Sequence, residues 1–138
     1  MAKLRTAIDA NVLIAAWSGN RVLYQRALQI LEDSERVLIV SDALWLETVP
    51  KAIYMAQAAE SAFYQSVFAR AECQAWSPSI VSTAKRLAQK YGLAAMDAVH
   101  ISVALAAQAD EFVSSEKPGK PMFRVKEIDT VSLRSLSA

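Results

Sequence analysis

Cysteine, histidine and glycine are scarce in this sequence, and each shortage excludes a class of site. The chain has one cysteine, Cys73, and one histidine, His100. A single cysteine cannot form an internal disulfide, which fits a reducing compartment. No second histidine or nearby cysteine provides the ligand spacing of a zinc site. With three glycines, the chain also has no glycine-rich loop of the kind that holds nucleotide phosphates.

Long apolar runs and a strong net charge are absent too. No run approaches the roughly 20 residues that a membrane-spanning helix needs, so we expect a cytoplasmic protein with no membrane partner. The formal net charge is +1, so no global basic field indicates a nucleic-acid partner, although a local basic patch is compatible with it. Hydrophobic residues make up 54% of the 138 residues, which is enough to form a substantial core. No repeat or linker divides the chain, so we expect one domain, 1–138.

The apolar residues alternate between strand-like and helix-like patterns along the chain. We predict strands at residues 4–8, 37–40, 72–76 and 111–114, and an edge strand at residues 130–136. We predict helices that begin near residue 12 and then span residues 21–33, 43–57, 60–71, 78–91 and 94–109. Pro50 should kink or interrupt its helix, and the last helix, apolar almost all round, should be buried. The alternation predicts a three-layer α/β/α sandwich with a mainly parallel central sheet.

Four acidic residues stand at positions where this architecture would bring them together. Asp9 and Glu116 follow predicted strands, and the carboxyl ends of such strands meet at the edge where α/β proteins bind ligands. Glu47 and Asp97 lie on apolar helices. Each has an ordinary alternative: Asp9 as a helix cap, Asp97 as a first-turn acid, Glu47 and Glu116 as solvated surface. Jointly, acids without a matched cation repel one another, and proteins tolerate this mainly to bind a divalent metal such as Mg²⁺ or Mn²⁺.

Four stretches of the chain resemble, in order and spacing, the signature of PIN-domain proteins, many of which are VapC-type ribonuclease toxins. These stretches are AIDANVLI, SDALWLETVPKA, AAMDAVHISVALAAQADEFV and SSEKPGKPMFRV. The resemblance covers essentially the whole chain. It assigns the family's first three acids to Asp9, Glu47 and Asp97, and the fourth to Glu116, where an Asp is more usual. Asn11 and Ser114 match its supporting polar positions, whereas Ala10 lacks the hydroxyl that is frequent there.

The resemblance implies a metal-dependent endoribonuclease that cleaves single-stranded or loop RNA and leaves a 5′-phosphate. Asp9, Asp97 and Glu116 would hold Mg²⁺ or Mn²⁺, and Glu47 would orient a water molecule on that metal. The basic residues after Glu116 would contact the RNA backbone; they are Lys117, Lys120 and Arg124, with Lys126 close by. The expected partners are an RNA substrate, an antitoxin protein and a second copy of the chain, with apolar residues 54–68 as a candidate surface.

Other interpretations remain open from the sequence. A non-catalytic PIN-like module that binds RNA or a protein is the main alternative, although clustered acids would not help a pure RNA binder. A receiver domain would need adjacent acids after its first strand and a lysine on a late strand, and that set is not evident. We expect His100 to be a core or hydrogen-bonded residue and Cys73 to be buried. We expect the three tryptophans to lie in the core or an interface; they are Trp17, Trp45 and Trp76.

Overall fold

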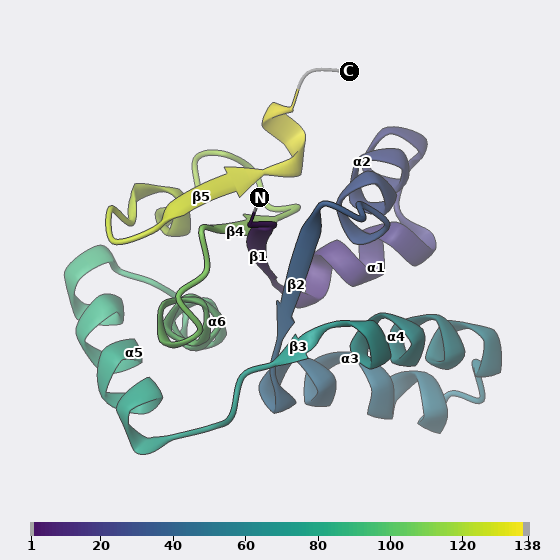
Figure 1. The fold of residues 1–138 in the computed structure, drawn as a ribbon, viewed down its shortest axis with the longest axis horizontal. Coiled ribbons are helices and arrows are strands. Elements are labelled where there is room, and N and C mark those ends of the chain that lie inside the picture. Colours follow the sequence, from purple (N-terminus) through teal and green to yellow (C-terminus); the bar gives the residue numbers. More distant parts are fainter. Residues whose placement is uncertain (1, 137–138) are drawn as a thin grey trace.

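Five parallel strands form the central sheet of the computed structural model, which describes residues 2–136 (Figure 1). The strands are β1 (Leu4–Ile8), β2 (Arg36–Val40), β3 (Glu72–Cys73), β4 (Glu111–Ser114) and β5 (Asp129–Ser132). Their order is β3-β2-β1-β4-β5, and every neighbouring pair is parallel. The first strand therefore lies in the middle, with Ala7 opposite Ile39 on one side and Phe112 on the other.

Helices cover both faces of this sheet. They are α1 (Ala10–Ser18), α2 (Arg21–Leu31), α3 (Asp42–Tyr54), α4 (Ala58–Arg70), α5 (Pro78–Tyr91) and α6 (Ala95–Ala106). Side chains alternate between the faces of a strand, so Ile8 packs in a core with residues of α1–α4, whereas Ala7 packs in a second core with residues of α5 and α6. Figure 1 shows α5 and α6 on one side and the other four helices on the opposite side. The predicted three-layer α/β/α sandwich is confirmed.

Local sequence explains where several helices begin and end. The side chains of Asn20 and Ser41 accept hydrogen bonds from backbone N–H groups in the first turns of α2 and α3. Pro78 occupies the first turn of α5, where no N–H is needed. Gly92 ends that helix with a φ of 71°, a left-handed conformation that glycine adopts without steric cost. None of the helices between residues 2 and 136 is long and apolar enough to cross a bilayer.

Three predictions about element bounds are wrong in part. Pro50 does not interrupt α3, which runs on to Tyr54 because Val49 and Ala52 on either side of the proline are buried in the core. The strand predicted at 72–76 is only two residues long, since its partner β2 ends at Val40. The strand predicted at 130–136 begins one residue earlier and stops at Ser132, whose hydroxyl accepts a hydrogen bond from the backbone of a short 3₁₀ turn, Leu133–Ser135.

One prediction about burial is wrong, and a second, for the tryptophans, is wrong as to the core, whereas their place in an interface stays a prediction. Cys73 is exposed, because β3 is an edge strand whose two residues both face solvent. The three tryptophans retain substantial exposure, between 37% and 49%. Trp17 packs beside Phe63, with ring centroids 5.8 Å apart, so its indole rests on the surface of the core rather than within it.

Candidate active site

The carboxyl edge of the sheet brings all four predicted acids around one pocket. Asp9 follows β1 and Glu116 follows β4, while α3 contributes Glu47 and α6 contributes Asp97. These side chains line a pocket of about 220 Å³ together with Ala10, Asn11, Ile14, Met96 and His100. Four segments that are far apart in sequence thus contribute to one concave surface, where the topology of an open α/β sheet favours ligand binding.

Asp9 is the most buried acid of the group, with 4% of its surface exposed. Its Oδ1 accepts a hydrogen bond from the backbone N–H of Asn11 at 3.2 Å, so it also caps α1. Burial raises the pKa of Asp9 to about 7, although a hydrogen bond with Ser114 and the charge of His100 act in the opposite direction. The cap interpretation is correct, and it does not exclude the site interpretation, because the same carboxylate lines the pocket.

Asp97 lies in the first turn of α6 and is partly buried. Burial raises the pKa of Asp97, and the negative charge of Glu116 raises it further, while His100 and Lys120 act to lower it. The two acids are therefore near enough to repel each other in the absence of a cation. Among the basic residues predicted to contact the RNA backbone, Lys120 is the one whose charge acts on the pKa of Asp97. Lys117, Arg124 and Lys126 are exposed.

Glu47 and His100 form a pair that links α3 to α6. The His100 Nε2 hydrogen bonds with the Glu47 Oε1. The histidine side chain is 4% exposed and the Glu47 side chain 32% exposed, so a fixed imidazole holds a carboxylate that solvent and ligands can reach. The prediction that His100 is hydrogen-bonded is confirmed. Of the four acids expected to lack a matched cation, Glu47 is the one with a basic partner among residues 2–136, namely His100.

Asn11 fastens the loop after β4 to the start of α1. Its Oδ1 accepts hydrogen bonds from the Ser115 N–H at 2.8 Å and from the Ser114 hydroxyl at 3.3 Å. Its Nδ2 donates to the Glu116 carboxylate at 3.3 Å, and the Glu116 N–H donates to the Ser114 Oγ at 3.1 Å. Asn11 and Ser114, the two supporting positions predicted from the sequence, therefore orient Glu116 toward the pocket.

A divalent cation is chemically compatible with these residues. Within residues 2–136, no group of three or more His, Cys, Asp and Glu side chains is clustered tightly enough to form a ready-made metal site. The donor set nevertheless consists of carboxylate oxygens, the ligands that Mg²⁺ and Mn²⁺ prefer. In the described part of the chain, neither Asp9 nor Asp97 forms an ion pair with a basic side chain. Their pKa values are raised chiefly by burial, which destabilises the charged carboxylates, and a bound cation would favour the charged form.

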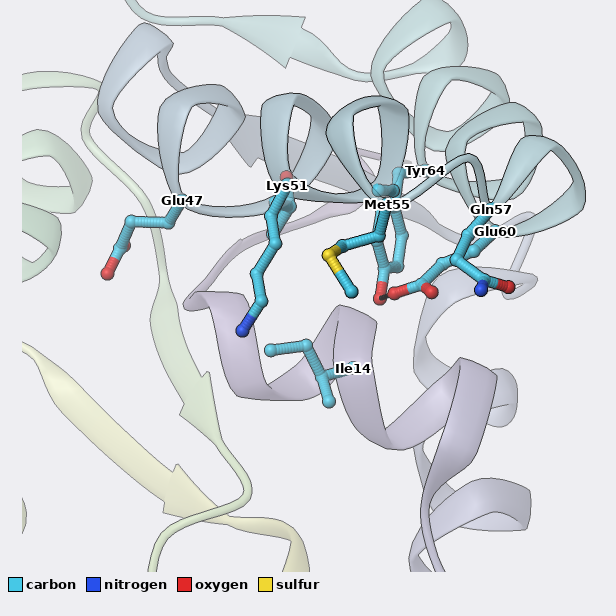
Figure 2. A pocket seen from close by; sticks show the side chains of 9 residues that line it. Ile14, Glu47, Lys51, Met55, Gln57, Glu60 and Tyr64 are labelled. Atoms are coloured by element: carbon cyan, nitrogen blue, oxygen red, sulfur yellow. Dashed lines mark hydrogen bonds between the residues drawn. The ribbon is translucent and has the colours of Figure 1, made fainter.

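One basic residue beside the site was missed from the sequence. Lys51 lies on α3 one turn after Glu47 and lines the neighbouring pocket, which Glu47 and Ile14 also line (Figure 2). Lys51 follows Glu47 by four residues, which places the two side chains on the same helix face. This spacing was the signal in the sequence from which Lys51 could have been predicted.

Comparison with known proteins gives one family and a set of similar folds. The model of the family described as the PIN domain matches residues 6–117. No curated protein matches the sequence.

Solved structures with similar folds include two toxin–antitoxin complexes. VapBC2 from Rickettsia felis, bound to a promoter DNA fragment, is 13% identical over 94% of this chain and 98% of that chain, with a TM-score of 0.69. A toxin–antitoxin complex from Klebsiella pneumoniae is 20% identical over 93% of this chain and 97% of that chain, also at 0.69. PAE2754 from Pyrobaculum aerophilum is 16% identical over 96% and 91%, with a TM-score of 0.62. At these identities the likeness is one of fold.

Proposed function

This chain belongs to the PIN-domain family, and from that premise we propose that it is a metal-dependent endoribonuclease acting on single-stranded or loop RNA. One observation carries the proposal: Asp9, Glu47, Asp97 and Glu116, delivered by four separate segments, line a single pocket at the carboxyl edge of the sheet. Repulsion among these acids opposes folding, so their convergence has a cost that metal binding and catalysis explain.

The side chains divide into two roles. Asp9, Asp97 and Glu116 would hold Mg²⁺ or Mn²⁺, and Asn11 and Ser114 keep Glu116 oriented. Such a metal, when bound, would neutralise charge that develops on the phosphodiester and lower the pKa of the attacking water. Glu47, held by His100, accepts a hydrogen bond from the attacking water and so aligns it with the phosphorus. In-line attack leaves a 5′-phosphate on the released strand.

RNA binding in this proposal uses the basic side chains beside the acids. Lys120 is close enough to Asp97 for its charge to act there, and Lys117 and Arg124 are exposed on the same segment. Lysine and arginine contacts to phosphates position a strand without reading its sequence. Sequence is read on unstacked bases, which single strands and loops present.

We further propose that the protein is the cytoplasmic toxin of a toxin–antitoxin pair, folds as one domain over residues 1–138, and forms a homodimer. The likeness to complexes that are themselves toxin–antitoxin assemblies supports an antitoxin partner. Exposed apolar side chains on α3 also support a protein partner, with Leu46 68% exposed and Tyr54 87% exposed. A short reading frame for a DNA-binding protein directly upstream of the gene would support the pair. A monomer in light scattering at micromolar concentration would overturn the dimer.

The test of the nuclease uses a fluorescent single-stranded RNA with Mn²⁺ or Mg²⁺. Asp9→Asn and Asp97→Asn are each expected to slow cleavage by about 100-fold or more, the scale of losing an electrostatic element of an active site. EDTA should abolish wild-type cleavage, and added Mn²⁺ should restore it. Asp129→Asn is the matched control, because that exposed acid lies at the opposite edge of the sheet.

Two outcomes would contradict this proposal. Full cleavage by Asp9→Asn in EDTA would exclude a metal nuclease centred on these acids. A wild-type protein that binds the RNA but leaves it intact at millimolar Mn²⁺ would favour the non-catalytic module. Circular dichroism of each variant establishes that a loss of cleavage does not reflect unfolding.

A further inference from the structure

A second pocket adjoins the acidic one and has a different chemistry. Its volume is about 340 Å³, within the range of about 300–1,000 Å³ typical of small-molecule sites. Ile14 and Glu47 line both pockets, so the two are direct neighbours. Figure 2 shows its layout: α3 lies above, α1 with Ile14 lies below, and the far end is closed by residues of α4 and of the turn before it.

Lys51 is the cation of this second pocket. It follows Glu47 by one helical turn, about 6 Å along α3, and its side chain extends toward Ile14 in Figure 2. Lys51 forms no ion pair with another side chain of residues 2–136. An exposed, unpaired ammonium beside a phosphodiesterase site is a ready contact for the next phosphate of a strand.

The end of the pocket away from Glu47 carries hydrogen-bonding groups that a buried tyrosine holds in place. The Tyr64 side chain is 1% exposed, and its hydroxyl donates to the Glu60 Oε2 at 2.6 Å. Burial raises the pKa of the Tyr64 phenol, so the phenol stays a donor. Glu60 is thereby fixed with acceptor positions still available, and Gln57 lies next to it (Figure 2). Between this end and Lys51, Met55 and Ile14 offer apolar surface.

We propose that this second pocket binds the nucleotide next to the scissile phosphate and prefers guanine there, an inference that rests on the proposed ribonuclease function. Lys51 contacts the phosphate, and the base packs between Met55 and Ile14. Glu60 accepts hydrogen bonds from the Watson–Crick edge of the base. Guanine presents two adjacent donors on that edge, N1–H and N2–H₂, which match the two oxygens of a carboxylate, whereas uracil presents a single donor, N3–H, between two carbonyl oxygens that a carboxylate repels.

The observations favour RNA over a protein segment as the occupant. The pocket shares Glu47 and Ile14 with the acidic site, so when a phosphate of a strand reaches the acids, the neighbouring nucleotide can lie in this pocket. A cation, an apolar middle and a fixed acceptor occur in the order in which one nucleotide presents its phosphate, the faces of its base and the Watson–Crick edge of that base. Glu60→Gln preserves an acceptor for Tyr64 and removes the charge, which makes it a conservative probe of base recognition.

Two measurements test the inference. In the first, RNAs that differ only by G or U beside a mapped cut are cleaved with Mn²⁺, and the ratio of their kcat/KM values is compared between proteins. We expect a wild-type preference for G that falls about fivefold to tenfold in Glu60→Gln, the low end for one lost bidentate contact. Glu35→Gln is the matched control, because Glu35 is exposed and lies directly before β2, at the amino ends of the strands.

The second measurement is binding without metal, by fluorescence anisotropy of the same RNAs in EDTA. Lys51→Ala should weaken binding about fivefold on either RNA and reduce the slope of log K against log salt by about one, as expected for one lost phosphate contact. Lys85→Ala, an exposed lysine on α5, should leave both values unchanged.

The outcomes separate this inference from the nuclease proposal. A wild-type protein that cleaves RNA, with base preference and salt slope unaltered by both pocket variants, overturns the inference alone and points to a protein occupant of the pocket. A protein that binds RNA through Lys51 and Glu60 but never cleaves it supports the inference and overturns the nuclease. A protein that neither binds nor cleaves RNA overturns both.

Discussion

Acidic residues lie at both ends of the parallel strands, but their partners differ. The amino ends of the strands form what we call the amino edge of the sheet, and the carboxyl ends form its carboxyl edge. At the amino edge, Arg36 hydrogen bonds with Asp33 at 3.0 Å and with Glu111, while Arg5 binds Glu72 through two hydrogen bonds of 3.1 and 2.5 Å. The Arg5 guanidinium, chiefly through its hydrogen bonds, lowers the pKa of Glu72. Each of these acids has a guanidinium partner, and charge-assisted hydrogen bonds of this kind are stronger than neutral ones.

Among residues 2–136, the acids at the carboxyl edge lack guanidinium partners. The pKa values of Asp9 and Asp97 are raised, chiefly by burial. The basic side chains that act on the pKa of Asp97 are His100 and Lys120 rather than a forked guanidinium. The two groups of acids therefore differ in their partners, and this difference separates the proposed site from acids in ordinary ion pairs. The predictions below test whether the amino edge serves stability and the carboxyl edge serves function.

The largest effect on stability should come from breaking the amino edge. Arg36→Met leaves the Glu111 carboxylate, 15% exposed, without its cation. We expect a loss of about 2–3 kcal/mol in the free energy of unfolding, because removing one partner leaves a largely buried charge uncompensated. Urea unfolding at neutral pH measures the loss, and Arg86→Met on α5 is the control. RNA cleavage below the melting temperature should not change; a variant as stable as the wild type would remove the contrast between the edges.

A smaller effect should come from His100, which supports Glu47 at the carboxyl edge. His100→Ala should lower kcat for RNA about tenfold with little change in KM, since a mispositioned water-orienting group affects the reaction more than binding. His100→Gln retains an N–H donor and should recover part of kcat. If the two variants lose kcat equally while differing in melting temperature, His100 has only a packing role.

The smallest effect concerns stability at the carboxyl edge itself. Relieving repulsion by Asp97→Asn should leave the metal-free protein as stable as the wild type or stabilise it by about 0.5–2 kcal/mol. The same variant should lose most of the melting-temperature rise that millimolar Mn²⁺ gives the wild type, because ligand binding stabilises by mass action.

Glu72→Gln is the control for this measurement, because it removes an acid that has a cation partner and should not stabilise the protein. If Asp97 acted only on the helix dipole, its neutralisation would destabilise the protein and metal would have no effect. Thermal melts of the three proteins, with and without Mn²⁺, distinguish these results.

The sequence by itself determined the layers and the edge at which the acids meet. Strands 4–8 and 111–114 follow from local apolar runs. Asp9 comes after the first of them and Glu116 after the second. Because parallel strands end at a common edge, the two acids were expected to meet there. The two sides of the sheet follow from alternation within β1, where Ile8 and Ala7 face different cores. These features depend on residues that are near one another in the chain.

Only the tertiary structure decided which charges are compensated. His100 and Glu47 are 53 residues apart and Arg36 and Glu111 are 75 apart, so no local pattern predicts either pair. The position of the Lys51 pocket beside the acidic pocket depends on how α1, α3 and α4 pack. Periodicity specifies which face of an element is buried, but packing between elements sets which partner each polar side chain meets and how deeply each acid is buried.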